Sequence, residues 1–470
     1  MKKNLLSYIL PALIICACGK GPVLETGTLP ELVPDIAGVT VPRDIAPLNF
    51  KVAGAERVKV EITAGECRIR VSGSFADIPV RRWHRLLSQA DELELRVCAR
   101  IGGKWYGYEP FGITVSDDAI DPYLLYRRID PGYELYARMG IYQRELNSFK
   151  ETVVFDNSEV SPGCMNCHSV QRCKPESFQL HLRGNKGGTY LRGGGLPDRV
   201  MDMKNDRTLG TVYPYWHPSG NYIAYSTNDI RQSFHNVPEK VLEVYDLASD
   251  IVVYDVRKDE ITVLPLLADS TKLETFPVFS ADGGTLYYCC SERADNFADI
   301  RYSLMAVGFN SEDCSLCGEP RVIWQAEGKS VSFPRPSYDG RWLMFTVSDF
   351  GNFSIWHPEA DLYQMDLASG RARPLEELNS PDTESYHSWS SNSKWVVFSS
   401  RRIDGRFTRP YIAHIGEDGR FDKPFLLPFS SPEYETLMLQ SYNIPEFCSG
   451  PVSIDKDLIY NTERKPITVR

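Results

Sequence analysis

Residues 276–292 read FPVFSADGGTLYYCCSE, and this stretch decides the fold. An aromatic residue and Pro come first, a polar turn with Gly follows, and an alternating apolar strand comes last. The same pattern begins again at three other places, as YPYWHPSGNYIAYSTN at 213, FPRPSYDGRWLMFTVSD at 333 and YHSWSSNSKWVVFSSRR at 386. The starts lie 53 to 63 residues apart. This is somewhat more than the roughly 40–50 residues of a four-stranded propeller blade, and inserted loops fit the difference. Residues 209–470 are therefore predicted to form a β-propeller.

The copies resemble the repeat of TolB-type β-propellers, in which an aromatic residue, Pro and two further residues precede Ser-Pro-Asp-Gly and a short hydrophobic strand. The likeness is strongest in the second and third copies. It weakens in the first copy, where His217 and Ser219 replace the usual Ser and Asp, and in the last, which lacks Gly. Residues 441–463 and 189–207 could add to the four visible copies. We therefore expect five or six blades.

The first residues have the pattern of a secretion signal. Lys2 and Lys3 precede an apolar stretch that ends near residue 17 and is too short to span a bilayer, so we expect residues 1–17 to be cleaved. The end of this stretch, residues 15–19, reads ICACG and resembles the bacterial lipobox. The resemblance implies that Cys18 is lipidated and anchors the protein to a membrane. An ordinary signal peptide remains the alternative.

Between the anchor and the repeats, the pattern changes twice. Residues 18–42 are rich in Gly and Pro without periodicity, which suits a flexible tether. Residues 43–118 alternate apolar and polar residues, which predicts a small β-sandwich-like domain. Residues 119–152 have a weak helical spacing, and residues 119–208 as a whole are interpreted as a connector. The whole chain is thus expected to be all-β, with a linker segment between two β domains.

The linker segment contains Cys164-Met165-Asn166-Cys167-His168, a C-x-x-C-H motif. Two thiols three positions apart on one local turn can add to the two vinyl groups of a porphyrin, and the next residue then places an imidazole at the iron. The motif predicts one haem c, with Cys164 and Cys167 as attachment sites and His168 as the proximal iron ligand. A single haem suits one-electron transfer, redox sensing or peroxide chemistry.

Three other interpretations of the motif stay open. A thioredoxin-like C-x-x-C needs a βαβ setting, which the surrounding sequence lacks. A structural zinc site needs four ligands, and only Cys173 and His181 lie near the motif. A structural disulfide is the third. Haem is favoured because the expected export of the chain and the C-x-x-C-H motif both favour covalently bound haem.

The sixth position of the iron is less constrained by the sequence. His181 is the leading candidate because it shares the segment of the motif, and His217, Met201 and Met203 are the alternatives. With no side chain in that position, the iron could bind small ligands. The second C-x-x-C, which begins at Cys314, lacks a following His and is expected to form a local disulfide.

Composition excludes several classes of function. The net charge is −10 and the basic residues are scattered, so nucleic acid is not an expected partner. The sequence has no nucleophile-elbow, H-E-x-x-H or paired metal motif, so no hydrolase is predicted. Export would permit disulfides, and Cys67 and Cys98 could bridge the N-terminal domain.

Taken together, the lipobox, the N-terminal β domain, the haem motif and the propeller resemble a group of Bacteroidetes lipoproteins sometimes labelled cytochrome c biogenesis proteins. The resemblance implies a lipid-anchored protein of the cell envelope, in the periplasm or on the outer membrane. The first hypothesis is a monohaem cytochrome-like protein whose propeller docks a redox partner. The alternatives are a non-enzymatic TolB-like scaffold that binds envelope proteins, and a haem peroxidase-like enzyme.

Overall fold

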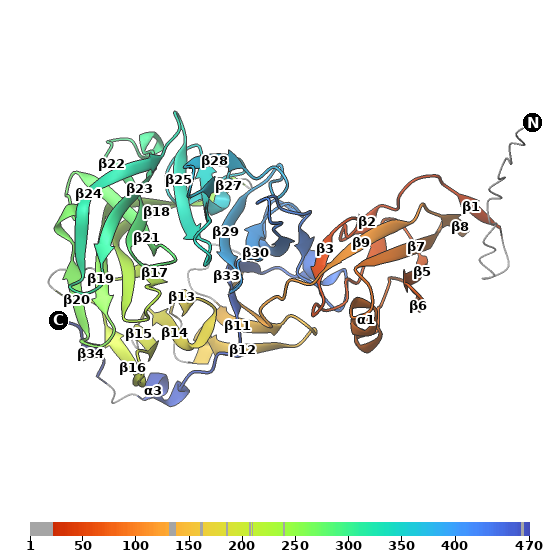
Figure 1. The fold of residues 1–470 in the computed structure, drawn as a ribbon, viewed down its shortest axis with the longest axis horizontal. Coiled ribbons are helices and arrows are strands. Elements are labelled where there is room, and N and C mark those ends of the chain that lie inside the picture. The colour runs from red at the N-terminus through yellow and green to blue at the C-terminus, as the bar shows by residue number, and fades with distance from the viewer. Residues whose placement is uncertain are drawn as a thin grey trace, which may run out of the picture.

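A computed structural model describes residues 22–130, 138–159, 163–184, 187–205, 208, 210–237, 240–461 and 465–470. The predicted signal peptide and the predicted lipidation site at Cys18 lie outside these residues. Within them, no helix has both the length and the apolar character needed to cross a membrane. The chain is all-β, and a β-propeller forms its larger part (Figure 1).

The four sequence repeats form four consecutive antiparallel sheets of four strands each. Their innermost strands carry the aromatic residues that open the repeats, and the polar turns lead into the second strands. The first two sheets are joined by one parallel bridge between Ser249 and Leu273. The strands of these sheets are β17 (Val212–Trp216), β18 (Tyr222–Val237), β19 (Lys240–Asp255), β20 (Glu260–Val263), β21 (Lys272–Phe279), β22 (Thr285–Glu292), β23 (Ser303–Asn310), β24 (Ser315–Trp324), β25 (Ser330–Pro336), β26 (Trp342–Ser348), β27 (Asp361–Asp366), β28 (Arg371–Pro374), β29 (Glu384–Trp389), β30 (Trp395–Ser400), β31 (Arg409–His414) and β32 (Phe425–Leu426).

The turn of each repeat is built by its own side chains. In the second copy, the Ser280 hydroxyl donates to Asp282 Oδ1 over 2.5 Å, and the same carboxylate accepts the N–H of Gly284 over 3.0 Å. Gly283 has a φ of 82°, which a residue without a Cβ adopts at little cost. The polar Asp-Gly pair therefore fixes the reversal between the two strands.

The predicted connector, residues 119–208, instead forms strands of two further sheets. Strands from the C-terminal end complete both, since β33 pairs with β10 and β34 pairs with β16. Burial on both faces removes the period-two alternation from β10 and β11, which explains why the sequence did not reveal them. These strands are β10 (Tyr123–Ile129), β11 (Met139–Glu145), β12 (Glu151–Asp156), β13 (Met165–Gln171), β14 (Lys174–Leu182), β15 (Gly188–Gly193), β16 (Leu196–Asp202), β33 (Ser441–Cys448) and β34 (Ile467–Thr468).

The innermost strands of the sheets contact one another in a closed ring. β13 contacts β17, and the contacts continue through β21, β25, β29 and β33 back to β13. Short helical segments lie between the strands. They are η1 (Asn157–Glu159), η2 (Pro265–Leu267), η3 (Phe297–Asp299), η4 (Ser354–Trp356), α2 (Tyr434–Leu437) and α3 (Lys456–Tyr460).

The N-terminal domain begins earlier than the sequence suggested. The described part of the predicted tether supplies β1, which pairs with β8, and β3, which pairs with β9. Val39 and Val41 are fully buried there, so apolar burial holds this Gly- and Pro-rich segment against the sheet. The elements are β1 (Val23–Glu25), β2 (Leu32–Val33), β3 (Thr40–Pro42), β4 (Lys51–Val52), β5 (Arg57–Ala64), β6 (Cys67–Gly73), α1 (Val80–Leu87), β7 (Glu92–Ile101), β8 (Lys104–Gly107) and β9 (Phe111–Ser116).

Most of these strands form one seven-stranded sheet, and only β2 and β4 pair separately. A β-sandwich is therefore not confirmed. The predicted alternation is present, since every second residue of β5 is buried. One face of the sheet packs on α1, whose Trp83 is fully buried and donates its indole N–H to the carbonyl of Ile45 over 3.1 Å.

No disulfide joins the cysteines whose side chains the structure describes. Cys67 lies on β6 and Cys98 on β7, and β5 runs between these two strands. Cys67 is opposite Ala64 of β5, whereas Cys98 is opposite Lys59, so the two cysteines are also offset along the sheet. The bridge that the sequence suggested is therefore absent from this domain. Cys314 and Cys317 are likewise not bonded to each other.

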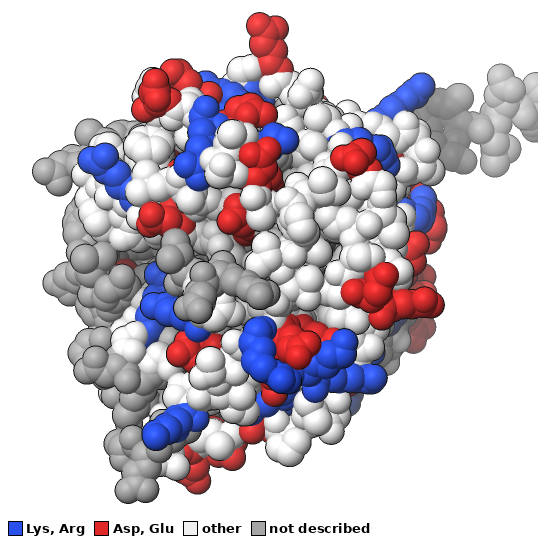
Figure 2. Space-filling model, turned by 90° about the vertical axis from the view of Figure 1, so that its left-hand side faces the viewer, with Lys and Arg blue, Asp and Glu red and all other residues white. Residues whose placement is uncertain are grey.

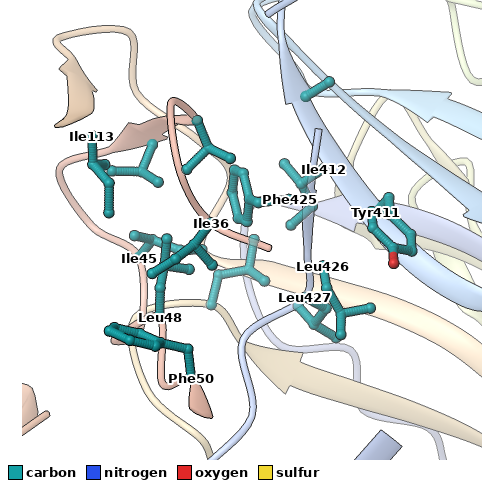
Figure 3. Packing of buried hydrophobic residues seen from close by; sticks show 14 of the residues in the cluster. Ile36, Ile45, Leu48, Phe50, Ile113, Tyr411, Ile412, Phe425, Leu426 and Leu427 are labelled. Carbon is teal, nitrogen blue, oxygen red and sulfur yellow. The ribbon is translucent and has the colours of Figure 1, made fainter. Parts of the chain in front are cut away.

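An apolar contact joins the N-terminal domain to the last of the four repeat sheets (Figure 3). Ile36, Ile45, Leu48 and other buried residues of the N-terminal domain face buried residues of β31, β32 and the segment after them. Asn49 adds a polar contact by donating to the carbonyl of Ser430 over 2.9 Å. The two domains therefore share one hydrophobic core at this junction.

His414 connects the two domains through its imidazole. Nδ1 lies 3.0 Å from Asp422 Oδ2 in the propeller, and Nε2 lies 2.8 Å from Asp118 Oδ2. Burial lowers the pKa of His414, but the hydrogen bonds to Asp422 and Asp118 outweigh burial, so the pKa is raised above 6.5. Stability from this group is complete below about pH 6.5 and is lost as the pH rises through the folded-state pKa.

We therefore expect the urea midpoint of the wild type to fall as the pH rises above about 6.5, and His414→Gln to lose this part of the pH dependence. His235→Gln, on β18, is the control. The same pH profile in His414→Gln and wild type would contradict the assignment.

Candidate functional site

A cavity of about 1180 Å³ lies where the innermost strands β13, β17 and β33 begin. Residues from β18, β19 and the loops that follow β26 and β30 complete its wall. The volume is slightly above the ~300–1,000 Å³ range typical of small-molecule sites. Most of the exposed lining is apolar.

The structure brings two of the predicted site residues together at this cavity. Cys164 and His181 both line it. His181 lies on β14 directly opposite Asn166 of the motif, so the pairing of β13 and β14 places the two side by side. Met203 also lines the cavity, but Met201 and His217 do not. The side chain of Cys167 lies outside what the structure describes.

His181 is held in one orientation. Its Nδ1 is 2.9 Å from the Thr189 hydroxyl on the neighbouring strand β15. Burial lowers the pKa of His181 to about 4, so the ring is neutral at neutral pH. A neutral imidazole with one nitrogen fixed by a hydrogen bond is the form in which histidine binds metals.

His168 has a different environment. Its side chain is fully buried and does not line the cavity, and its Nε2 lies 3.7 Å from Glu446 Oε2 on β33. Burial lowers the pKa of His168 to about 3 and raises that of Glu446 to about 8. Both groups are therefore uncharged at neutral pH, and their contact is not an ion pair although the distance alone would suggest one.

The second half of the motif occupies a position that recurs around the ring. In each innermost strand, the pairing register shifts by one residue at a bulge. The bulges fall at Cys167-His168 in β13, Tyr213-Pro214 in β17, Phe276-Pro277 in β21, Phe333-Pro334 in β25, Tyr386 in β29 and Ile444-Pro445 in β33. The motif thus lies on a strand, at a bulge like those of the repeat strands, and not on the local turn that its spacing predicted.

His387 shows that a histidine at this position can be structural. It follows the bulge residue Tyr386, as His168 follows Cys167. Both imidazoles are buried, and burial lowers the pKa of His387 to about 3 as well. His168 therefore resembles a buried core histidine in its surroundings.

The aromatic residues that open the repeats form a row of contacting rings, and the two end members of the row reach the cavity. Their backbones have positive φ, which turns each ring away from the plane of its strand. The ring centroids of Tyr213 and Phe276 are 4.4 Å apart, those of Phe276 and Phe333 4.6 Å, and those of Phe333 and Tyr386 4.3 Å. Tyr213 and Tyr386 line the cavity. The sequence signature of the repeat thus also provides part of the site.

Two arginines at the cavity were missed by the sequence analysis. Arg127 on β10 and Arg401, directly after β30, both line it and are almost fully buried. Nη1 of Arg127 donates to the carbonyl of Met165 over 2.7 Å and to Asn166 Oδ1 over 2.8 Å, which fixes the start of the motif strand. No sequence signal points to these residues, because they come from segments far from the motif.

The cavity and the motif fit a haem in part. The volume, the apolar lining, the thiol of Cys164 and the neutral imidazole of His181 suit a haem. His168 does not suit the role of iron ligand in this conformation, because its ring is enclosed away from the cavity. Across the described ranges, no cluster of three or more His, Cys, Asp or Glu side chains forms a further metal site.

Charges on the propeller surface are mixed in sign. Figure 2 shows the side of the propeller that carries β20 and β24 in Figure 1, with Lys and Arg beside Asp and Glu. This face therefore has no large region of purely positive or purely negative electrostatic potential.

Comparisons with known proteins yield likenesses of fold only. No family model and no curated protein matches the chain. Among solved structures, a puromycin hydrolase mutant has a TM-score of 0.38 at 11% identity, covering 66% of this chain, and the chain spans 52% of that protein. A Synechocystis apocarotenoid oxygenase mutant has a TM-score of 0.38 at 10% identity over 87% and 96% of the two chains. A prolyl oligopeptidase B from Galerina marginata has a TM-score of 0.37 at 11% identity over 66% and 50%.

Proposed function

We propose that this protein carries one haem c in the cavity and exchanges single electrons with a redox partner of the cell envelope. One observation carries the proposal: Cys164 of the C-x-x-C-H motif and His181, the candidate axial ligand, line the same cavity. Cys167 is the second attachment site on this proposal. His168 would serve as the proximal ligand only if the start of β13 leaves its present pairing.

The chain's residues have defined roles in this proposal. A haem bound here would supply one-electron chemistry. Arg127 holds the backbone next to Cys164, and Thr189 orients His181. The apolar lining, with the rings of Tyr213 and Tyr386, would surround a bound haem with side chains of low polarity, which tunes a redox potential.

We further propose an anchored, six-bladed architecture. The two sheets completed by β33 and β34 would be the fifth and sixth blades, because their innermost strands belong to the same ring of contacts. Cys18 would carry the lipid, and the N-terminal domain would then lie between the membrane and the propeller. The outer face of the propeller would dock the partner.

The absorption spectrum of protein produced with haem-maturation machinery tests the proposal. After denaturation in pyridine, the wild type is expected to show a haemochrome that stays with the polypeptide, and Cys164→Ala/Cys167→Ala is expected to be colourless. Cys314→Ala/Cys317→Ala removes the other C-x-x-C and should keep the wild-type spectrum. A colourless wild type would overturn the haem proposal.

A second function, a haem-free scaffold that binds envelope proteins, is favoured by one observation. His168 occupies the position of the structural His387. If this function holds, Cys164→Ala/Cys167→Ala will bind the same envelope proteins as the wild type.

A further inference from the structure

Arg401 carries a charge that nothing in the described part of the chain neutralises by contact. Its backbone is fixed, since its N–H donates to Thr383 over 3.1 Å and its carbonyl accepts from Gly405 over 2.9 Å. The side chain is 2% exposed and lines the cavity. Its guanidinium makes no hydrogen bond or ion pair with the described residues, and its Nε is buried without a partner.

A buried guanidinium in this state is costly. Burial lowers the pKa of Arg401 to about 9, so the group still carries its charge at neutral pH. Asp382 and Asp404 affect the guanidinium only by Coulombic attraction, without a hydrogen bond to it. The ring of Trp356, with its centroid 3.1 Å from Cζ, provides a cation–π contact. Such a contact does not replace a hydrogen-bonded anion, and an unpaired buried charge is normally avoided.

Arg127 adds a second buried cation to the same cavity. It is 8% exposed, and its Nε is also buried without a partner among the described residues. The acids of the lining do not balance the two arginines. Asp202 and Asp229 are exposed, and Asp130 accepts a hydrogen bond from Gln440. The buried charge of the cavity is therefore positive.

The remaining lining of the cavity is largely apolar and suits the hydrocarbon part of a ligand. Apolar residues from five different elements line the cavity together with the two arginines: Ile129, Met139, Leu182, Leu242, Val244 and Ile355. A ligand that matches both parts must be apolar over most of its surface and must carry an acid group.

We propose that the cavity binds a carboxylate-bearing amphiphile whose acid groups pair with Arg401 and Arg127. The proposal rests on the cavity and goes beyond the haem. The carboxylate has two sources: the propionates of a bound haem or a free organic acid of the envelope. Planar guanidinium groups bind carboxylates through two parallel hydrogen bonds, which a buried arginine is pre-organised to donate.

Calorimetric titration of the purified full chain, produced without haem-maturation machinery, tests the proposal with dodecanoate and dodecan-1-ol as probes. We expect dodecanoate to bind more tightly than the alcohol, because both fill the apolar wall and only one reaches the arginines. Arg401→Gln should weaken dodecanoate about tenfold or more and leave the alcohol unchanged, as loss of a charged hydrogen bond does. Arg406→Gln, an exposed arginine at the same cavity, should change either probe less than about threefold.

A stability measurement separates a binding role from a structural one. If the role of Arg401 is to bind a ligand, the Arg401→Gln variant without ligand should have an unchanged or higher midpoint of unfolding, because a buried unpaired charge is removed. Equal affinities for the two probes, or a lowered midpoint with unchanged dodecanoate binding, would overturn the proposal. Chain produced with the maturation machinery identifies the source. Loss of dodecanoate binding there assigns the site to propionates, and retained binding assigns it to a free acid.

Discussion

Removal of residues 441–470 should abolish the cooperative unfolding transition of the propeller. This segment contains β33, which pairs with β10 between Tyr123–Cys448 and Ile129–Ser441 and also contacts β13 and β29. Tyr442 and Phe447 on β33 are fully buried. Without them the ring has a gap, β10 has an open edge, and two neighbouring sheets lose their contact.

Thermal unfolding followed by near-ultraviolet circular dichroism measures this effect. Removal of residues 465–470 is the matched control, because it takes away β34, which pairs with β16 at only two positions. The shorter truncation should keep a single transition at a somewhat lower temperature. A cooperative, native-like transition in the chain without residues 441–470 would show that β33 does not close the ring.

Trp395→Ala should lower the free energy of unfolding by about 3–5 kcal/mol, the usual cost of removing a buried Trp side chain. Trp395 opens β30 and is fully buried. Its Nε1 donates to the carbonyl of Asp118 over 3.0 Å, and its ring centroid lies 4.8 Å from that of His414. The substitution therefore leaves a cavity in the propeller and removes a hydrogen bond that crosses to the segment after the N-terminal domain.

Urea unfolding monitored by far-ultraviolet circular dichroism measures the loss. Trp105→Ala on β8, whose ring is partly exposed and contacts Lys59, serves as the control and should cost less than about 1.5 kcal/mol. If the two variants are equally destabilised, Trp395 does not hold the junction.

The sequence predicted the propeller because each repeat contains its own turn chemistry. Asp282 and Gly283 act locally, and period-two alternation marks the strands that are buried on one face. The sheets of residues 119–208 were missed because β11 is buried along almost its whole length and shows no alternation. Their partner strands also come from the far end of the chain, and no local pattern indicates such a pairing.

The part of the candidate site that could be predicted is the part whose residues lie close together in the sequence. Cys164 directly precedes β13, and His181 lies 17 residues later on β14, which pairs with β13, so their proximity in the sequence was enough to connect them. Arg401 lines the same cavity only because the chain folds into a ring, since it is far from both residues in the sequence. A single arginine between two strands forms no motif that a sequence could reveal. The burial of His168 depends on Glu446 and on the bulge of β13, which become visible only when the innermost strands are compared.

The pairing of β33 with β10 also sets an order of events for a chain that is synthesised from its N-terminus. Leu124 can pair with Phe447 only after Phe447 has been synthesised. Until then, β13 also lacks its contact with β33. Until Ser441–Cys448 has been made, the strand that follows Cys164 lacks this neighbour, and His168 lacks Glu446, which lies beside it in the folded chain. If the proposed haem is attached, its attachment to Cys164 and Cys167 is expected to precede the pairing of β33 with β10.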